Sequence, residues 1–261
     1  MEILNFPYDQ LKIFLLVLIR ISCVLFLFPI FGSKVFPNLV KAGLALVMAL
    51  ALTPVVKIDL TLFPENTVTV VIFIASEIFI GLVLGLSIRL FFASVQFAGQ
   101  LIGFQTGFMM ANVIDPQSGT QVSLIEQFAY WIALIIFLIL DGHHMLITAM
   151  VQSFDVINVG IISLKKELLS QMLLLSSNMF ILAIKIGSPA IAALLFTSAG
   201  FGLCARFVPQ MNILIVSFPF KIAVGLIFLG ITFQIISIVT QIYCSNFLFL
   251  LFTLVKMLGN V

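Results

Sequence analysis

The sequence predicts an all-α integral membrane protein. Of its 261 residues, 62% are hydrophobic and only 8% are charged, whereas a soluble domain is about half apolar and about a quarter charged. The aromatic residues comprise 28 Phe, 3 Tyr and 1 Trp, a balance typical of side chains that contact lipid or dry protein surfaces. Such a chain cannot build a water-exposed surface, so a bilayer or large partner surfaces must surround it.

A spanning helix needs about 20 predominantly apolar residues, and the chain offers about six apolar segments by that measure. They lie near Ile13–Phe31, Ala42–Val56, Val68–Phe92, Phe128–Leu140, Met179–Phe201 and Ile213–Tyr243, the last with an apolar tail to Leu254. We interpret the first segment as an uncleaved helix, because it lacks a small-residue cleavage site.

The lengths of these segments match a bilayer poorly. The second and fourth are short, whereas Val68–Met110 would be about 60 Å long as a single helix. Prolines interrupt the apolar regions and favour breaks or kinks; they are Pro29, Pro37, Pro54, Pro189 and Pro219. Broken helices at membrane depth need protein or a cavity to cover the freed backbone groups. We therefore expect kinked helices packed inside an assembly.

Glycines recur at four-residue spacing in and after the third segment. Gly81 and Gly85 form one pair, and Gly99, Gly103 and Gly107 form a tandem run. This spacing places small residues on one face of a helix, where two backbones can approach closely. Packing within the chain and contact with another subunit both explain the pattern, and the sequence leaves both open.

Four ionisable residues stand out within apolar segments, where a charge is costly and points to function. We expect Arg20, Glu77, Arg89 and Lys185 to be buried charges. Glu77 and Arg89 are about 18 Å apart along one helix, which is too far for them to pair. We therefore predict an ion pair between Arg20 and Glu77. The alternative is that each side chain lies near a helix end and extends to water.

The charges elsewhere are sparse, and no basic run could follow a phosphate backbone, so nucleic acid is not an expected partner. The three cysteines, Cys23, Cys204 and Cys244, are far apart in apolar stretches, and we expect no disulfide. No G-x-x-x-x-G-K-[ST] or G-x-S-x-G motif occurs. We therefore expect neither an enzyme nor a bound cofactor.

The stretch Asp141-Gly142-His143-His144 suggests at first a metal or acid–base site. Adjacent histidines are expected to point to different sides of a helix, however, and no H-E-x-x-H arrangement is present. We therefore favour a structural role, in which these residues cap the end of the fourth apolar segment. No metal site is expected.

The segment from Gly107 to Gln121 differs from its surroundings. It begins with flexible apolar methionines and continues with the turn signals Asp-Pro and Ser-Gly. It is either a loop that connects two spans or a mobile element able to seal a passage with adaptable Met and Phe side chains.

Several motifs together resemble the FliR family, the export-gate subunits of the flagellar type III secretion apparatus. In chain order they are G-Q-L-I-G-F-Q-T-G-F at 99–108, D-P at 115–116, F-L-I-L-D-G-H-H at 137–144, S-F at 153–154, R-F-V-P-Q-M-N at 206–212 and P-F-K-I at 219–222 with Gly225. The resemblance covers essentially the whole chain, and D-G-H-H together with R-x-x-P-Q-M-N is specific.

The resemblance implies one copy within a helical export gate of kinked hairpins, in the bacterial inner membrane at the flagellar basal body. Implied partners are FliP-like and FliQ-like sister subunits, FlhB-like and FlhA-like export components, membrane lipid and unfolded protein substrates. Residues 1–201 would correspond to the FliP-like subunit and 202–261 to the FliQ-like one, with Arg206, Pro209 and Gln210 near the junction. The loop after the glycine-rich helix would plug the closed pore, through Phe108, Met109, Met110, Asn112, Asp115 and Pro116.

Other functions remain open at this point. Homologous subunits serve injectisomes, although the D-G-H-H and D-P-x-x-G elements look more flagellar. Intramembrane charges and broken helices are also typical of secondary transporters, but the two halves of the chain show no clear duplication. An intramembrane hydrolase would need a matched nucleophile and base or a metal triad, and none is visible in the sequence.

Overall fold

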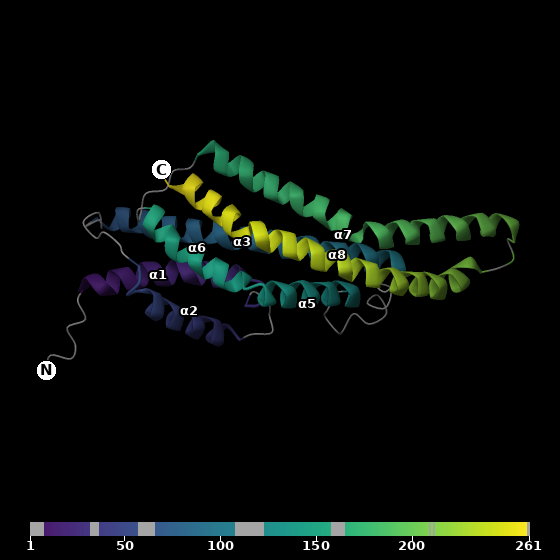
Figure 1. Cartoon of the computed structure of the whole chain (residues 1–261), viewed down its shortest axis with the longest axis horizontal. Coiled ribbons are helices and arrows are strands. Elements are labelled where there is room, and N and C mark those ends of the chain that lie inside the picture. The colour runs from purple at the N-terminus through teal and green to yellow at the C-terminus, as the bar shows by residue number, and fades with distance from the viewer. Residues whose placement is uncertain are drawn as a thin grey trace. The chain divides into compact units, whose positions relative to one another are not determined.

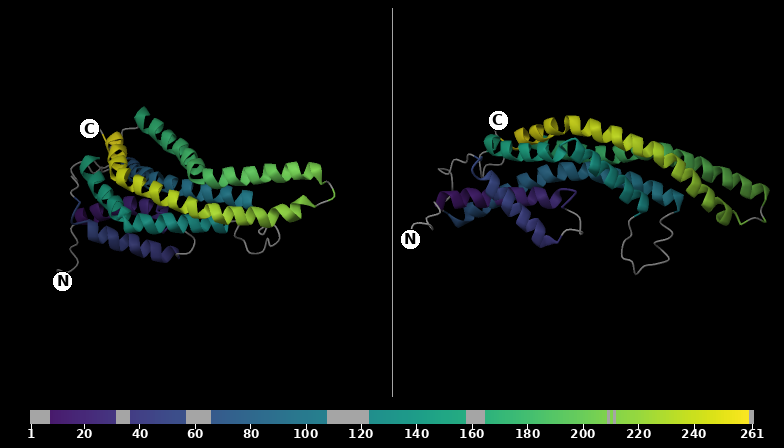
Figure 2. Two further views of the ribbon diagram at one scale, coloured as in Figure 1. Left: turned by 45° about the vertical axis from the view of Figure 1, so that its right-hand side comes forward. Right: turned by 60° about the horizontal axis from the view of Figure 1, so that its bottom comes forward.

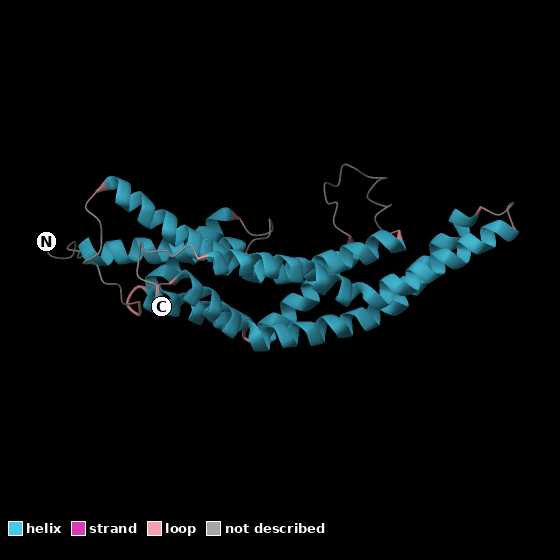
Figure 3. Ribbon diagram, turned by 90° about the horizontal axis from the view of Figure 1, so that it is seen from above, coloured by secondary structure: helices cyan, strands magenta, loops and turns pink. Residues whose placement is uncertain are grey.

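The computed structural model describes residues 8–31, 37–56, 66–107, 123–157, 165–208, 210 and 212–259. Within these ranges the regular structure is entirely helical (Figure 3), which confirms the predicted all-α class. The helices are α1 (Tyr8–Leu27), α2 (Asn38–Leu52), α3 (Thr67–Thr106), α5 (Leu124–Ile139), α6 (Gly142–Val156), α7 (Lys166–Phe207) and α8 (Ile213–Leu258).

Four of these helices are long and apolar enough to cross a membrane: α1, α3, α7 and α8. The broken pair α5 and α6 would make a fifth span, so the expected count of about six was approximate. With 40, 42 and 46 residues, α3, α7 and α8 are about 60 to 70 Å long, roughly twice the hydrocarbon core of a bilayer. The third predicted segment stops at Phe92, but α3 continues to Thr106 because tertiary packing overrides the low helix propensity of its glycines.

The five prolines act in two ways. Pro29, Pro37 and Pro54 lie just outside α1 and α2, where a missing backbone N–H does no damage. Pro189 and Pro219 lie inside α7 and α8. Of the predicted break or kink, a break does not occur at either position, because both helices continue past the proline. Proline has no backbone N–H, so Pro189 cannot donate to the Lys185 carbonyl one turn earlier. That carbonyl instead accepts a hydrogen bond from the Ser188 hydroxyl at 2.9 Å.

The chain divides into two compact units that both draw on α3, α7 and α8. Unit 1 contains residues 1–90, 141–175 and 244–261, and unit 2 contains residues 91–140 and 176–243. In unit 1, α2 packs against α1 (Figures 1 and 2). Lys165, directly before α7, donates a hydrogen bond to the Gly259 carbonyl at 3.0 Å and so joins the start of α7 to the end of α8 within this unit.

Unit 2 is built around the second half of α3. The Phe91 and Tyr243 rings stack with centroids 3.8 Å apart, which joins α3 to α8, and Phe92 contacts the Phe137 ring of α5 edge to face at 5.5 Å. Toward the connection between α7 and α8, Phe201 contacts Phe220 edge to face at 5.4 Å. The buried centre of this unit consists of Ile102, Ile125, Ala190, Leu194 and Leu229.

Candidate functional site: a buried ion pair and close-packed helix faces

Arg20 is a fully buried arginine on α1 at the centre of unit 1. Its Nε donates a hydrogen bond to Glu77 Oε2 at 2.6 Å and its Nη2 donates to Oε1 at 2.9 Å. Both side chains are 0% exposed. The predicted partners therefore lie together on α1 and α3, and they do so far from water rather than near a helix end.

Two residues of α6 complete the surroundings of Arg20. Its Nη1 donates to the Ser153 hydroxyl oxygen at 2.7 Å, and its guanidinium carbon lies 3.6 Å from the centroid of the Phe154 ring. Ser153 in turn donates to the Met150 carbonyl at 2.6 Å. We call the group Arg20, Glu77, Ser153 and Phe154 the arginine clamp, because it joins α1, α3 and α6 through one cation.

The clamp holds its charge because each part of the guanidinium has a partner. A bidentate carboxylate supplies the counter-charge, the serine accepts a third hydrogen bond, and the aromatic face attracts the cation. Removing one member of a buried pair leaves an uncompensated charge and costs about 3 to 5 kcal/mol. The arrangement therefore holds three helices together around one buried cation.

The first glycine pair packs against α1 next to the clamp. A Cβ at Gly81 would lie 2.7 Å from Cys23 Cβ and 2.9 Å from the Arg20 carbonyl oxygen, and a Cβ at Gly85 would lie 2.7 Å from Leu27 Cβ. Gly81 is one helical turn after Glu77, so this close approach of α1 and α3 brings Glu77 within reach of Arg20.

The tandem glycines of α3 face other helices of unit 2. A Cβ at Gly99 would lie 2.6 Å from the Glu126 Cα, and one at Gly103 would collide with the Ser123 hydroxyl, both at the start of α5. Gly107 ends α3 with a φ of 85° and lies against the Phe218 ring of α8. The structure fills both glycine faces with contacts inside the chain. Packing within the chain, one of the two explanations that the sequence left open, therefore accounts for the spacing.

Arg89 and Lys185 do not behave as expected. Both are exposed on this chain, so the expectation that they are buried is wrong for the isolated chain. The reason is geometric: Arg89 lies on the side of α3 that also exposes Leu82 and Leu86, away from the clamp. Their positive charges are therefore available on apolar helix surfaces.

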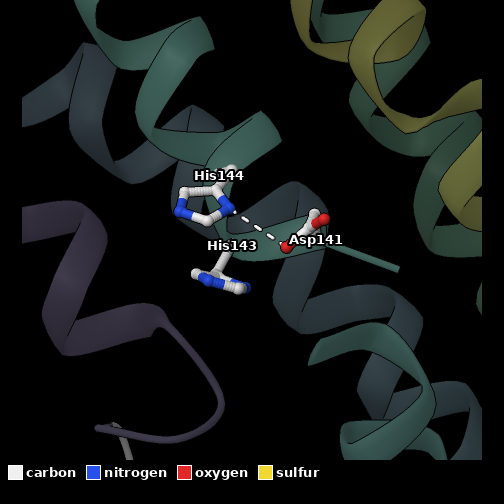
Figure 4. Close-up of side chains that lie close together, drawn as sticks. All are labelled: Asp141, His143 and His144. Carbon is white, nitrogen blue, oxygen red and sulfur yellow. Dashed lines mark hydrogen bonds and ion pairs between the residues drawn. The ribbon is translucent and has the colours of Figure 1, made fainter. Parts of the chain in front are cut away.

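The Asp-Gly-His-His stretch forms the turn between α5 and α6. Asp141 precedes α6 in the left-handed conformation, with a φ of 55°, and its Oδ1 lies 3.1 Å from His144 Nδ1. The expectation that the adjacent histidines point to different sides is wrong. Their ring centroids are 4.2 Å apart, and Figure 4 shows both imidazoles close to the Asp141 carboxylate.

The same stretch brings three possible metal ligands together. One ligand atom from each of Asp141, His143 and His144 lies within 4.8 Å of the other two. The sequence expectation that the spacing prevents convergence is therefore wrong as well. The expected cap at the end of α5 is not formed by this stretch: the C-cap is Leu140, whose N–H donates to the Ile136 carbonyl at 3.0 Å. Asp141 instead precedes α6, where its carbonyl accepts the Met145 N–H at 3.1 Å while its carboxylate makes no capping hydrogen bond.

The predicted plug residues, Phe108, Met109, Met110, Asn112, Asp115 and Pro116, lie outside the described residues, as does Pro209. Arg206 lies in the last turn of α7 and is exposed, and Gln210 in the following turn is also exposed. The proposed boundary between residues 201 and 202 falls inside α7.

Sequence reasoning missed three residues that the structure buries, the polar Ser153 and Lys41 and the aromatic Phe154. Ser153 and Phe154 occur among the family motifs, but nothing in their spacing relates them to Arg20, which is 133 residues from Ser153. Lys41 on α2 is 7% exposed. The available signal for Lys41 was a charged residue within an apolar helix. Because Lys41 lies near the start of α2, where a lysine side chain usually reaches water, this signal was overlooked.

Comparison with known proteins identifies the family. The family model described as bacterial export proteins, family 1, matches residues 11–247. The flagellar biosynthetic protein FliR of Bacillus subtilis is 36% identical over 241 residues, covering 91% of this chain and 92% of that protein. FliR of Aquifex aeolicus is 32% identical and covers 87% and 88%, and FliR of Escherichia coli is 30% identical and covers 80% and 79%. The chain therefore belongs to the bacterial export proteins of family 1, the FliR family.

Proposed function

We propose that this chain is a non-enzymatic core component of the flagellar type III protein export gate in the bacterial inner membrane, needed for flagellum assembly. The observation that carries the proposal is end-to-end similarity to proteins named flagellar biosynthetic protein FliR, which covers about nine-tenths of both chains in the Bacillus subtilis comparison. Similarity over a whole chain supports a shared role more strongly than a shared segment does.

The proposed role includes assembly with other chains. The helices α3, α7 and α8 are about twice as long as a bilayer core, and they expose large apolar side chains along their length, including Ile78, Leu86, Leu195, Phe196 and Phe207. Such surfaces need lipid or protein around them. The partners we propose are FliP-like and FliQ-like sister subunits, with FlhB-like and FlhA-like components and membrane lipid nearby.

Within that assembly we propose that residues 1–201 correspond to the FliP-like subunit and residues 202–261 to the FliQ-like one. Arg206, Pro209 and Gln210 would then form the turn after the junction. Arg89 and Lys185, as exposed cations on apolar helices, would meet acidic groups of neighbouring chains or lipid phosphates, because an unpaired charge in such surroundings is costly.

We further propose that the segment between α3 and α5 closes the channel to ions when no unfolded substrate passes. Its two flanks support this role, because Gly107 lies against Phe218 and Ser123 lies against Gly103. Both ends of the segment are thus anchored near the end of α3. The residues assigned to the seal are Phe108, Met109, Met110, Asn112, Asp115 and Pro116.

Two experiments test the proposal. First, the tagged chain is purified in mild detergent from its native membrane, and the co-purifying proteins are identified by mass spectrometry. Recovery of small helical gate subunits in fixed ratio supports the export role, whereas a chain that purifies alone and moves a small solute in liposomes contradicts it.

The second experiment addresses channel closure. Deleting residues 109–118 is expected to leave the complex intact but permeable to ions, measured as membrane conductance or as a salt-sensitive growth defect. A matched control deletes the same number of residues from the 57–66 region between α2 and α3. An unchanged conductance after the 109–118 deletion would refute the plug role and leave the export role standing.

A further inference from the structure

The turn between α5 and α6 gathers the only two histidines of the chain beside a carboxylate. Asp141, His143 and His144 each place one ligand atom within 4.8 Å of the other two, and Figure 4 shows the two imidazoles on the same side of the turn as the Asp141 carboxylate. Two imidazoles and one carboxylate form a ligand set that suits first-row divalent metals such as Zn²⁺ and Ni²⁺.

Two of the three ligands lie close to the separation that a single ion needs. With bonds of about 2.0 to 2.2 Å to nitrogen and oxygen, two ligands of one tetrahedral Zn²⁺ lie about 3.3 to 3.6 Å apart. Asp141 Oδ1 and His144 Nδ1 are 3.1 Å apart, so they need to separate by only a few tenths of an ångström, about 0.2 to 0.5 Å. The left-handed backbone of Asp141, with a φ of 55°, turns this carboxylate back over the first turn of α6.

His143 supplies an independent observation. Its Nδ1 is buried and has no hydrogen-bond partner among the described residues, and a buried polar atom without a partner is costly. The His143 ring lies beside that of His144, with centroids 4.2 Å apart, and one ligand atom of His143 is within 4.8 Å of those of Asp141 and His144. Asp141 and His144 are 69% and 68% exposed, so an ion can enter and water can complete its coordination.

We propose that Asp141, His143 and His144 bind one divalent transition-metal ion of the Zn²⁺ class. The ion would fasten Asp141 to the first turn of α6 and so hold the left-handed residue at which the helix begins. The positive end of the α6 dipole opposes a cation there, while the Asp141 carboxylate offsets it. The expected affinity is therefore micromolar, weaker than that of a buried structural zinc site. This inference does not depend on the proposed export function.

The competing explanation is that Asp141 and His144 form only a surface ion pair, which needs no metal. The two explanations differ in their use of His143. An ion pair gives His143 no role, whereas a metal site needs both imidazoles.

The test uses the full-length chain in detergent micelles, purified through a tag without histidine and carrying Cys204→Ser to remove an exposed competing thiol. Equilibrium dialysis against Zn²⁺ at neutral pH, followed by elemental analysis, measures the bound metal. One ion per chain is expected. His143→Gln and Asp141→Asn should each weaken binding at least about tenfold, and the His143→Gln/His144→Gln double variant should abolish it. Unchanged binding in the double variant would overturn the proposal.

A second measurement needs no variant at a ligand. Because the chain contains only two histidines, ¹⁵N-histidine labelling reports on this site alone. Addition of Zn²⁺ should shift the ring nitrogen resonances of both imidazoles with the same saturation. If one imidazole or neither responds, His143 and His144 do not share an ion and the proposal fails. The helical circular dichroism of each variant checks that the fold is kept.

Discussion

The Arg20 guanidinium and the Glu77 carboxylate form a bidentate ion pair with neither side chain accessible to solvent. The pair links α1 to α3, and Ser153 extends it to α6. A double-mutant cycle measures what it contributes. Arg20→Leu and Glu77→Leu should each destabilise the purified complex by about 3 to 5 kcal/mol, because each strands a buried charge. The Arg20→Leu/Glu77→Leu double variant should recover most of that loss, as measured by thermal unfolding in detergent.

The control for the clamp is Lys166→Ala, which removes an exposed cation near the start of α7 and should change stability very little. If the loss in the double variant equals the sum of the two single losses, the two residues do not interact. Flagellar motility in soft agar provides a parallel readout in cells.

A second prediction concerns the contact between α1 and α3. Gly81→Ala places a methyl group 2.7 Å from Cys23 Cβ and 2.9 Å from the Arg20 carbonyl oxygen. The helices must separate, so we expect a loss of about 1 to 3 kcal/mol in the free energy of unfolding. At Gly43, on α2, a Cβ would meet nothing within 4 Å, and Gly43→Ala should gain about 0.5 to 1 kcal/mol. A neutral effect of Gly81→Ala would contradict the close approach of α1 and α3 at this position.

A third prediction concerns the contact between α3 and α5. Gly103→Leu should prevent assembly of the complex without preventing membrane insertion, because the leucine side chain would displace Ser123 at the start of α5. Gly99→Ala should also be harmful, since its methyl group would meet Glu126 backbone atoms, which cannot rotate away. The matched control is Gly230→Ala on α8, where the space is open. Normal recovery of the complex with Gly103→Leu contradicts the prediction.

A fourth prediction concerns the exposed cation of α3. Arg89→Ala should lower the amount of partner protein that co-purifies with the chain, while the stability of the chain by itself stays nearly unchanged, because Arg89 is exposed and far from the clamp. Arg89→Lys should keep most of the binding if the contact needs only a positive charge. If Arg89→Ala co-purifies partners at the wild-type level, the residue has no role in assembly.

The fold class and the Arg20–Glu77 pair were predictable from the sequence because both follow from the cost of charge in an apolar environment. The unbroken course of α3 was predictable only in part: the glycine spacing indicated a helix over residues 99–107, but nothing in the sequence showed that it continues the segment ending at Phe92 without a break. The partners Ser153 and Phe154 were also out of reach, because contacts between distant helices leave no periodic signal. For the histidine pair, the prediction that adjacent side chains point to different sides of a helix failed. Backbone geometry fixes only where each Cβ points, and the side-chain torsions decide where the imidazole rings lie.

The buried arginine has a consequence for how the protein is made. When α1 leaves the ribosome, Glu77 and Ser153 have not yet been synthesised, so Arg20 has no partner. An arginine at the centre of a single helix costs about 2.5 to 3.5 kcal/mol on insertion scales. The charge of Arg20 therefore meets its counter-charge only after α3 is made, and α6 completes its surroundings later still. The clamp thus forms in the order in which its three helices are synthesised.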